Sequence, residues 1–438
     1  MADRRVAITG LGVVSAAGVG AQPFHDALSA GRSCVKQIDL FDASEFPSRV
    51  GGQIDDFSAR KFVPKSYRKS VKVMARDIEI AVAAADCAFR DAGINTRGID
   101  PDNVDVDPHR LGCNIAAGLI CTDLDELGMA VNTAVKDGRF DMKLWGESGM
   151  NNLTPLWLLK YLPNMLSCHV TIIHGAEGPS NCITCGDAAG YMAVGESARI
   201  IARGDADVVV AGGAESKLNC MNLMRHTLLK RLCESSNDDP ACACRPFDAG
   251  HDGTVIGEGG GLLILEDFDR ALQRKARIYA EIAGFGAACD PQGMDVTHPS
   301  AGGLDAAIRK AMTDAGIGPE DIDLIIAHGT GVPAEDRAES KAWFDALGDT
   351  AARIPATALT GAVGSLFSGA GGAELAAAAL ALQDQTVPPT ANFTKPAEGC
   401  GLSLSGEPRK AEIRNVLAGA FSVGGQSAAC VIRRVEES

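Results

Sequence analysis

Short apolar runs alternate with helix-like segments along the whole chain. The runs Arg5–Val14, Ala206–Ala211 and Gly261–Glu266 are typical of buried strands, and Ile78–Ala92 has the spacing of a helix that buries one face. We expect further strands at Ile278–Gly284, Leu324–Ala327, Val416–Ala420 and Ala428–Arg433. Strands that alternate with helices predict a layered α/β fold.

A short pattern of the first half recurs in the second half. Ala88–Ile94 (AFRDAGI) matches Ala311–Ile317 (AMTDAGI), and each copy ends an Ala-rich helix with a glycine at its C-terminal cap. Each copy also follows a strand that we expect to end in a glycine-rich turn (TGLG, AGFG). Two copies of one α/β unit predict two halves related by a pseudo-two-fold axis, meeting near residues 266–275.

Three glycine clusters could suggest a nucleotide site, but none has the complete pattern. Gly10-Leu-Gly12 lacks the third glycine of a dinucleotide fingerprint, and Gly257–Gly261 precedes a strand rather than a helix. Gly369–Gly372 lacks the Lys-Ser/Thr pair of a phosphate loop. We therefore interpret all three as packing glycines and expect no cofactor.

Composition and charge narrow the class of protein. Hydrophobic residues make up 46% and charged residues 22% of the 438 positions, which is typical of a soluble globular protein. The formal net charge of −15 argues against nucleic acid as a partner. No signal peptide or apolar run long enough for a membrane span is found, so we expect a cytoplasmic protein.

The 14 cysteines are expected to be reduced thiols in that compartment. The cluster Cys233, Cys242 and Cys244 has a C-x-C step but lacks the second cysteine or histidine pair that zinc sites usually have. We therefore expect free thiols and no metal.

Nine stretches along nearly the whole chain resemble the elongating beta-ketoacyl-acyl-carrier-protein synthases. They are Arg4–Gly12, Gly178–Ser180, Gly204–Asp207, Ala211–Glu215, Arg245–Asp248, Asp252–Gly253, His328–Gly331, Gly369–Glu374 and Val387–Thr390. The resemblance implies a thiolase-like five-layer α-β-α-β-α sandwich, here divided into halves 1–268 and 269–438. It also implies a homodimer or heterodimer and an acyl carrier protein as partner.

The resemblance implies a catalytic cysteine at the start of a buried helix and two histidines facing it, and this chain departs at two of the three positions. The cysteine position holds Asp187, the first histidine is His328, and the second histidine position holds Ser365. The family's lysine is Thr360 here. The substrate-binding positions implied by the resemblance are Thr330, Phe421, Val423, Gly424 and Gly425, with Val423 in place of a gating phenylalanine.

These departures argue against ordinary condensation by this chain alone. A carboxylate is a poor acceptor for a thioester, and losing a nucleophile typically costs about a millionfold in rate. One alternative uses Cys185, two residues upstream, as the nucleophile. Another joins Ser365, His328 and Asp187 in a hydrolase or acyltransferase triad. Roles for His298 stay open.

Asp187 also has a plain structural interpretation. It directly precedes a predicted helix, residues 188–203, and an aspartate at a helix N-cap accepts backbone N–H bonds. We expect this outcome, with His328 left to a backbone or water partner, because both family histidines approach through one nitrogen.

A basic run stands out in this acidic chain. Seven cations lie within 17 residues without an intervening acid: Arg60, Lys61, Lys65, Arg68, Lys69, Lys72 and Arg76. By resemblance, Lys65, Arg68, Lys69 and Lys72 are carrier-docking candidates, with a solvated surface as the alternative. Arg225, Lys230 and Arg231 form a second candidate patch.

The leading hypothesis is a ketosynthase-fold subunit of fatty-acid or polyketide synthesis that does not condense. It would resemble a chain-length factor, shape an acyl tunnel and pair with an active ketosynthase. The alternatives are the Ser365 hydrolase or acyltransferase, an active synthase that uses Cys185, and a homodimer that binds an acyl group without reaction.

Overall fold

A computed structural model describes residues 4–291, 300 and 302–436 of the chain. Its main sheet runs in the order β13-β12-β16-β17-β11-β1-β10-β9-β5-β8, with β2 (Gly18–Val19) paired to β1. The first-half strands are β1 (Val6–Ser15), β5 (Leu111–Ala116), β8 (Ser180–Ile183), β9 (Val208–Ser216) and β10 (Glu258–Asp267). The second-half strands are β11 (Ala280–Cys289), β12 (Leu324–Ala327), β13 (Ala356–Ala358), β16 (Asn415–Phe421) and β17 (Gln426–Arg433).

The two halves share one topology. In each half the five strands lie in the order third, second, fourth, fifth, first from the sheet edge inward. The third and fourth strands run parallel to the second, whereas the fifth is antiparallel to both of its neighbours. The first strands, β1 and β11, join the halves through an antiparallel pairing that includes Ile8 and Ala280. The duplication inferred from the short repeat is confirmed.

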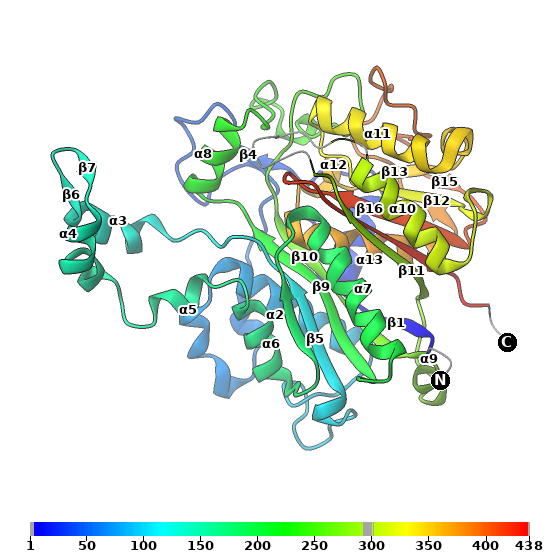
Figure 1. The fold of residues 1–438 in the computed structure, drawn as a ribbon, viewed down its shortest axis with the longest axis horizontal. Coiled ribbons are helices and arrows are strands. Elements are labelled where there is room, and N and C mark those ends of the chain that lie inside the picture. The colour runs from blue at the N-terminus through cyan, green and yellow to red at the C-terminus, as the bar shows by residue number, and fades with distance from the viewer. Residues whose placement is uncertain (1–3, 292–299, 301, 437–438) are drawn as a thin grey trace.

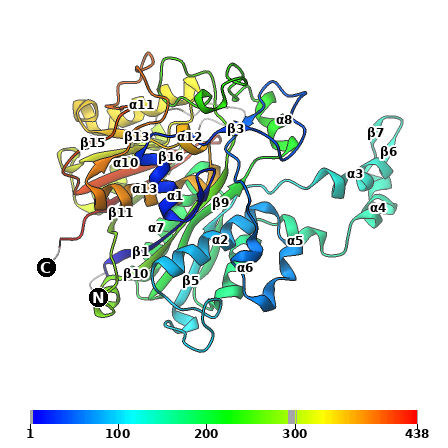
Figure 2. The ribbon, with the colours of Figure 1, turned by 180° about the vertical axis from the view of Figure 1, so that it is seen from behind.

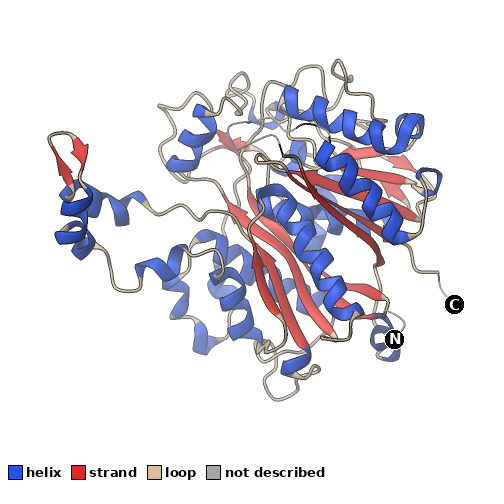
Figure 3. Cartoon of the chain, viewed as in Figure 1, coloured by secondary structure: helices blue, strands red, loops and turns tan. Residues whose placement is uncertain are grey.

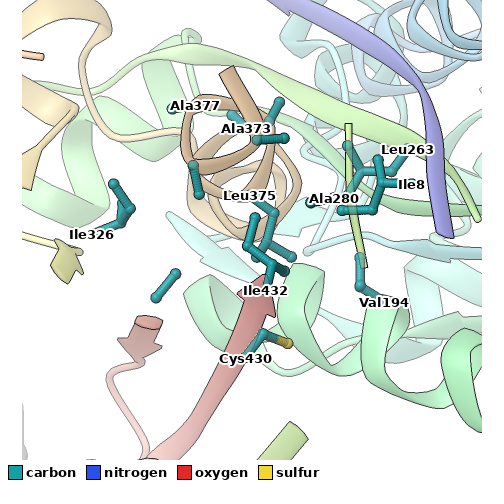
Figure 4. Close-up of a cluster of buried hydrophobic side chains, with 14 of the residues drawn as sticks. Ile8, Val194, Leu263, Ala280, Ile326, Ala373, Leu375, Ala377, Cys430 and Ile432 are labelled. Atoms are coloured by element: carbon teal, nitrogen blue, oxygen red, sulfur yellow. The ribbon is translucent and has the colours of Figure 1, made fainter. Parts of the chain in front are cut away.

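Helices lie outside and between these strands, giving the expected five-layer α-β-α-β-α sandwich (Figure 3). α2 (Arg76–Asp91) and α6 (Met165–His174) cover the outer face of the first half, and α10 (Gly302–Ala315) and α11 (Pro333–Leu347) that of the second. α7 (Ala189–Ala202) and α13 (Ala370–Asp384) form the central layer. Figure 4 shows side chains of both halves meeting there, among them Val194 of α7 and Leu375 of α13.

The repeated glycines have a packing role. They lie within β1 and β11, so the expectation that they form turns is wrong. A Cβ atom at Gly12 would stand 1.9 Å from the Ala84 carbonyl oxygen of α2, and one at Gly286 2.1 Å from the Ala307 carbonyl oxygen of α10. Each half therefore needs glycine where its first strand touches its outer helix.

The remaining elements are short and lie mostly on the surface. The helices are α1 (Ala21–Ser29), α8 (Cys220–Leu228), α9 (Phe268–Gln273) and α12 (Thr360–Val363). Short 3-10 turns include η1 (Ala59–Lys61), η2 (Lys65–Tyr67), η3 (Ser70–Val73), η6 (Gly186–Ala188) and η10 (Phe367–Gly369). Two small hairpins pair β3 (Lys36–Gln37) with β4 (Val50–Gly51) and β14 (Thr386–Val387) with β15 (Arg409–Lys410).

One segment projects from the body, as both ribbon views show (Figures 1 and 2). This arm, residues 119–161, holds α3 (Leu124–Thr133), β6 (Val135–Lys136), β7 (Arg139–Phe140), α4 (Met142–Glu147), η5 (Gly149–Asn152) and α5 (Trp157–Tyr161). Its exposed apolar side chains are Leu119, Leu124, Met129, Val135, Phe140, Met142, Met150, Leu156, Leu158 and Leu159. Across the described part of the chain, no helix combines the length and apolar character needed to cross a membrane.

Candidate functional site

Asp187 lies on the tight turn that leads from β8 into the central helix α7. Gly186 adopts a left-handed conformation with φ of 58°, which glycine tolerates without strain. The Ser422 hydroxyl fixes this turn from the second half: it accepts the Ala188 N–H at 3.0 Å and donates to the Cys185 carbonyl at 2.8 Å. Asp187 is only 7% exposed, so its carboxylate needs partners within the protein.

His328 supplies that partner from the end of β12. Its fully buried ring has Nε2 3.5 Å from Asp187 Oδ1, and its Nδ1 donates to Glu374 Oε1 at 2.9 Å. Glu339 holds the backbone in place, because its two carboxylate oxygens accept the N–H groups of His328 and Gly329 at 2.7 and 2.8 Å. The imidazole therefore lies between two carboxylates.

The charges of this cluster are mutually dependent. Burial alone would lower the pKa of His328, but Glu374 and Asp187 outweigh burial and raise that pKa well above its usual value. Burial alone would raise the pKa of Asp187, but the His328 ring and the more distant Arg231 lower it overall. Both directions favour a charged pair, with the His328 ring placed between the Asp187 and Glu374 carboxyl groups.

This arrangement overturns the expectation that Asp187 caps the helix. α7 begins after Ala188, its N-cap has no side-chain hydrogen bond, and Asp187 faces His328 instead. The expectation that His328 has a backbone or water partner is also wrong, since Glu374 binds it. Because the Asp187 carboxylate is buried, it needs a charged partner, and the adjacent His328 ring supplies one.

Sequence reasoning missed the roles of Glu374 and Tyr191. Glu374 ends the stretch Gly369–Glu374 that resembles the family, but no sequence pattern assigns a function to its carboxylate. The fully buried Tyr191 hydroxyl donates to Glu374 Oε2 at 2.6 Å, so both oxygens of this carboxylate are engaged. The sequence offered one signal for this contact. Glu374 is an acid within an otherwise apolar, Ala-rich helix, and such an acid is expected to need a partner such as His328.

Ser365 does not complete a relay with His328. It is buried, and its backbone pairs with Val255 and Gly257, but its hydroxyl has no hydrogen-bond partner within residues 4–291, 300 and 302–436. Both ring nitrogens of His328 already face carboxylates, so a serine proton has no imidazole acceptor. Thr360 donates its hydroxyl to the Gly329 carbonyl and so braces the turn after His328.

Cys185 lacks the features of a reactive thiol. It is half-buried beside Ala116, Ala189 and Ala193, and burial, with a smaller effect of Cys289, raises its thiol pKa. Cys233, Cys242 and Cys244 are free thiols. Nowhere in the described chain do three or more His, Cys, Asp or Glu residues gather in a way that could hold a metal ion.

The other implied substrate positions lie near the β16–β17 turn and the His328 loop. Phe421 presents its ring edge-on to His328, with centroids 6.0 Å apart. Val423 is half-buried, Gly424 is exposed and Gly425 is buried, and both glycines have φ above 90°. Thr330 is buried and its hydroxyl accepts the Val332 N–H at 3.2 Å. His298 lies outside the described residues.

The basic run divides into a free part and a structural part. Six cations on or beside η1, η2 and η3 are exposed and make no ion pair with any residue that the structure describes: Arg60, Lys61, Lys65, Arg68, Lys69 and Lys72. Arg76 instead makes a bidentate contact with buried Glu258 at 2.7–2.8 Å. The second candidate patch loses one of its three members, because Arg231 is buried and pairs bidentately with Glu335 at 2.8 Å.

Comparison with known proteins shows the family. The model of the beta-ketoacyl synthase N-terminal domain matches residues 3–271, and that of the C-terminal domain matches residues 279–394. The chain belongs to the beta-ketoacyl synthase family. The 3-oxoacyl-[acyl-carrier-protein] synthase 2 of Coxiella burnetii is 34% identical over 437 residues, covering 99% of this chain and 100% of the relative.

Relatives from polyketide synthesis are similarly close. The tetracenomycin ketoacyl synthase alpha subunit of Streptomyces glaucescens is 32% identical over 440 residues, covering 100% of this chain and 99% of the relative. Among solved structures, the ishigamide ketosynthase/chain length factor aligns over 99% of this chain and 100% of its own with a TM-score of 0.85 and 28% identity. A beta-ketoacyl synthase from Burkholderia phymatum aligns over the same shares with a TM-score of 0.86 and 28% identity.

Proposed function

We propose that this beta-ketoacyl synthase family member is a non-condensing, chain-length-factor-like subunit of fatty-acid or polyketide synthesis in the cytoplasm. One observation carries the proposal: at the nucleophile position, Asp187 forms a buried ion pair with His328, whose other nitrogen is bound by Glu374. We further propose that the halves 1–268 and 269–438 act together, the first contributing Asp187 and the second His328 and Ser365.

The charge balance of the site opposes the donor of condensation. His328 lies between the carboxyl groups of Asp187 and Glu374, and Arg231 pairs with Glu335, so each of these two cations is already engaged. A malonyl group brings a further carboxylate into this low-dielectric region, where like charges repel strongly. The site therefore favours a neutral acyl chain, as a subunit that shapes a tunnel requires.

The exposed arm supports a partner subunit of the same fold. Its apolar side chains have no covering surface within the described chain, and the edge strand β8 leaves Ser180 and Asn181 exposed. Exposed apolar patches and open sheet edges are typical of interaction sites. The solved ishigamide relative is a ketosynthase paired with a chain length factor, so we propose an active ketosynthase as the partner.

The exposed cations on η1–η3 support docking of an acyl carrier protein. They form a local basic patch on a chain of net charge −15, and opposite charges steer association even when the whole protein is acidic. In a similar solved structure, AntDE:AntF, an acyl carrier protein is bound to its ketosynthase. We propose Lys65, Arg68, Lys69 and Lys72 as the contact residues.

The decisive experiment measures condensation. Purified protein is incubated with acyl- and malonyl-carrier protein, alone and with a candidate ketosynthase, and 3-oxoacyl product is measured by mass spectrometry. We expect no product from the protein alone and longer products from the pair. Turnover by the protein alone contradicts the proposal, and loss of that turnover in Cys185→Ala would identify Cys185 as the nucleophile.

Docking is tested separately by charge reversal. The double variant Lys65→Glu/Lys69→Glu should bind carrier protein at least tenfold more weakly, and rising salt should weaken wild-type binding. Lys275→Glu/Lys341→Glu, which makes the same charge change at exposed lysines elsewhere, is the matched control. Equal affinities of the two double variants would assign the basic patch to an ordinary solvated surface.

A further inference from the structure

Two cysteines from different halves of the chain lie at the same end of the central layer. Cys185 directly precedes the η6 turn of the first half, and Cys289 is the last residue of β11 in the second half. Both are free thiols, and Cys289 is the only exposed one of the 14 cysteines, whereas Cys185 is half-buried. The proposed function assigns no role to either thiol.

The strand β11 turns the Cys289 side chain toward α7. The ring of Phe285 on β11 faces this helix, because a Cβ atom at Gly195 would lie 2.3 Å from it. Side chains alternate along a strand, and the β11–β17 register is regular from Gly284 to Cys289. Cys289, four residues after Phe285, therefore faces the same side of the sheet as Phe285 does.

The lengths of the strand and the helix bring Cys289 level with the η6 turn. Four residues of strand from Phe285 to Cys289 advance about 13 Å. Nine residues from Gly195 back to Gly186 advance about 14 Å along the helix. Because Phe285 and Gly195 are in contact, equal advances in one direction end beside each other.

The turn between β16 and β17 shows that the directions agree. Cys289 lies opposite Gln426 in the β11–β17 ladder. The Gln426 carbonyl accepts the Ser422 N–H at 2.8 Å, and the Ser422 hydroxyl donates to the Cys185 carbonyl at 2.8 Å. Two residues thus connect the cysteines. The electrostatics agree with this placement, since burial raises the pKa of Cys185 and a nearby Cys289 thiolate raises that pKa further.

The different exposure of the two thiols sets an order of oxidation. The exposed Cys289 thiolate attacks the O–O bond of a peroxide, which gives a sulfenic acid and releases the first water. Cys185, a poor first nucleophile because its pKa is raised, then attacks the sulfenic sulfur, and the second water leaves. Two thiols and one hydrogen peroxide give one disulfide and two waters. The first step also removes the Cys289 thiolate that opposes ionisation of Cys185.

We propose that Cys185 and Cys289 are a peroxide-sensitive modification site at which oxidation joins the two halves by a disulfide. The bond would tie the end of β11 to the turn that carries Asp187. Transient, redox-sensing disulfides of this kind are the ones expected in a reducing compartment. The proposal goes beyond the proposed function and does not depend on it, because it needs neither a carrier protein nor a partner subunit.

The test is peptide mass spectrometry of the full chain after treatment with hydrogen peroxide. Remaining thiols are blocked with N-ethylmaleimide, and the chain is digested without reduction. We expect a linked pair of peptides that contain Cys185 and Cys289, two hydrogens lighter than their sum and separated by dithiothreitol. Oxidation in urea, which removes the folded geometry, should not favour this pair.

Three serine variants distinguish the pair from general thiol oxidation. Cys289→Ser should lose the link, and Cys185→Ser should accumulate a sulfenic acid at Cys289 that dimedone labels. Cys220→Ser, at a half-buried cysteine on α8, is the matched control and should form the link as the wild type does. Oxidation of Cys289 in the folded wild type without a bond to Cys185, or a bond from Cys289 to a different cysteine, would overturn the proposal. The wild-type measurement needs no variant to fold.

Discussion

The two halves have the same turn at the start of their central helices but fill it differently. η6 in the first half begins at Gly186 with φ of 58°, and η10 in the second begins at Phe367 with φ of 50°. Four residues later, Gly190 and Gly371 meet where α7 and α13 cross. The duplicated backbone is thus conserved down to a single left-handed residue.

The two turns differ in their contacts with the candidate site: only the first turn places a charged side chain in it. Glycine adopts the left-handed conformation freely, whereas Phe367 carries a strain of about 1–2 kcal/mol. The second residue of the relaxed turn, Asp187, faces His328, while the second residue of the strained turn, Ser368, donates its N–H to Glu215 at 2.9 Å. One turn presents a charge to the site, and the other holds an aromatic ring against His226.

The largest effect should follow from breaking the charge cluster that distinguishes the first turn. Glu374→Gln removes the carboxylate that compensates buried His328 and should lower the free energy of unfolding by about 3–5 kcal/mol. Urea unfolding at pH 7 measures it, with the exposed Glu320→Gln as control. A loss below about 1 kcal/mol would mean that Asp187 alone sustains the imidazolium.

Alanine variants at the crossing of α7 and α13 test whether both helices need glycine where their backbones touch. A Cβ atom at Gly371 would lie 2.5 Å from the Tyr191 backbone nitrogen, so Gly371→Ala should cost about 2–3 kcal/mol. Gly190→Ala, whose nearest contact would be 2.9 Å, should cost less. Gly128→Ala on α3 meets no atom within 4 Å and should instead stabilise by about 0.5–1 kcal/mol. Equal behaviour of all three variants would contradict the packing explanation.

The sequence predicted the fold more accurately than it predicted the side-chain contacts within the site. Apolar runs and the Ala88–Ile94 repeat were sufficient for the strands and the duplication, because burial patterns are local and periodic. The resemblance placed Asp187 and His328 correctly as neighbours. Their orientation depended on Glu374, which approaches from another helix, and on burial, which local patterns such as an N-cap do not report.

Pairing between residues that are far apart in the chain also explains why part of each basic patch was misjudged from the sequence. Arg76 continues the charge pattern of Lys65–Lys72 but pairs with Glu258, 182 positions away along the chain. Arg231 looked like a surface cation and is buried for a similar reason.

The pH dependence of stability isolates the contribution of Asp187. Its lowered pKa means that its carboxylate stabilises the fold above the unfolded pKa, near 3.9, and that this stabilisation is lost as pH falls through the folded pKa. The raised pKa of His328 stabilises fully below about 6.5 and is lost as pH rises through its folded pKa. Asp187→Asn should therefore be about 1–3 kcal/mol less stable at pH 6, with the gap closing below pH 4. A gap of constant size down to pH 3 would exclude the ion pair as its cause.

The smallest effect concerns the left-handed residue itself. Gly186→Ala introduces the strain that Phe367 already bears, about 1–2 kcal/mol, and its Cβ would stand 2.9 Å from the Ser422 hydroxyl. Gly93→Ala has nearly the same φ, 62°, but no atom within 4 Å, so it should cost the strain alone. The excess of Gly186→Ala over Gly93→Ala then measures what it costs to displace Ser422 from its bonds to Cys185 and Ala188. If the two variants unfold at the same urea concentration, Ser422 moves aside freely, and its bonds to Cys185 and Ala188 contribute little to holding the first turn.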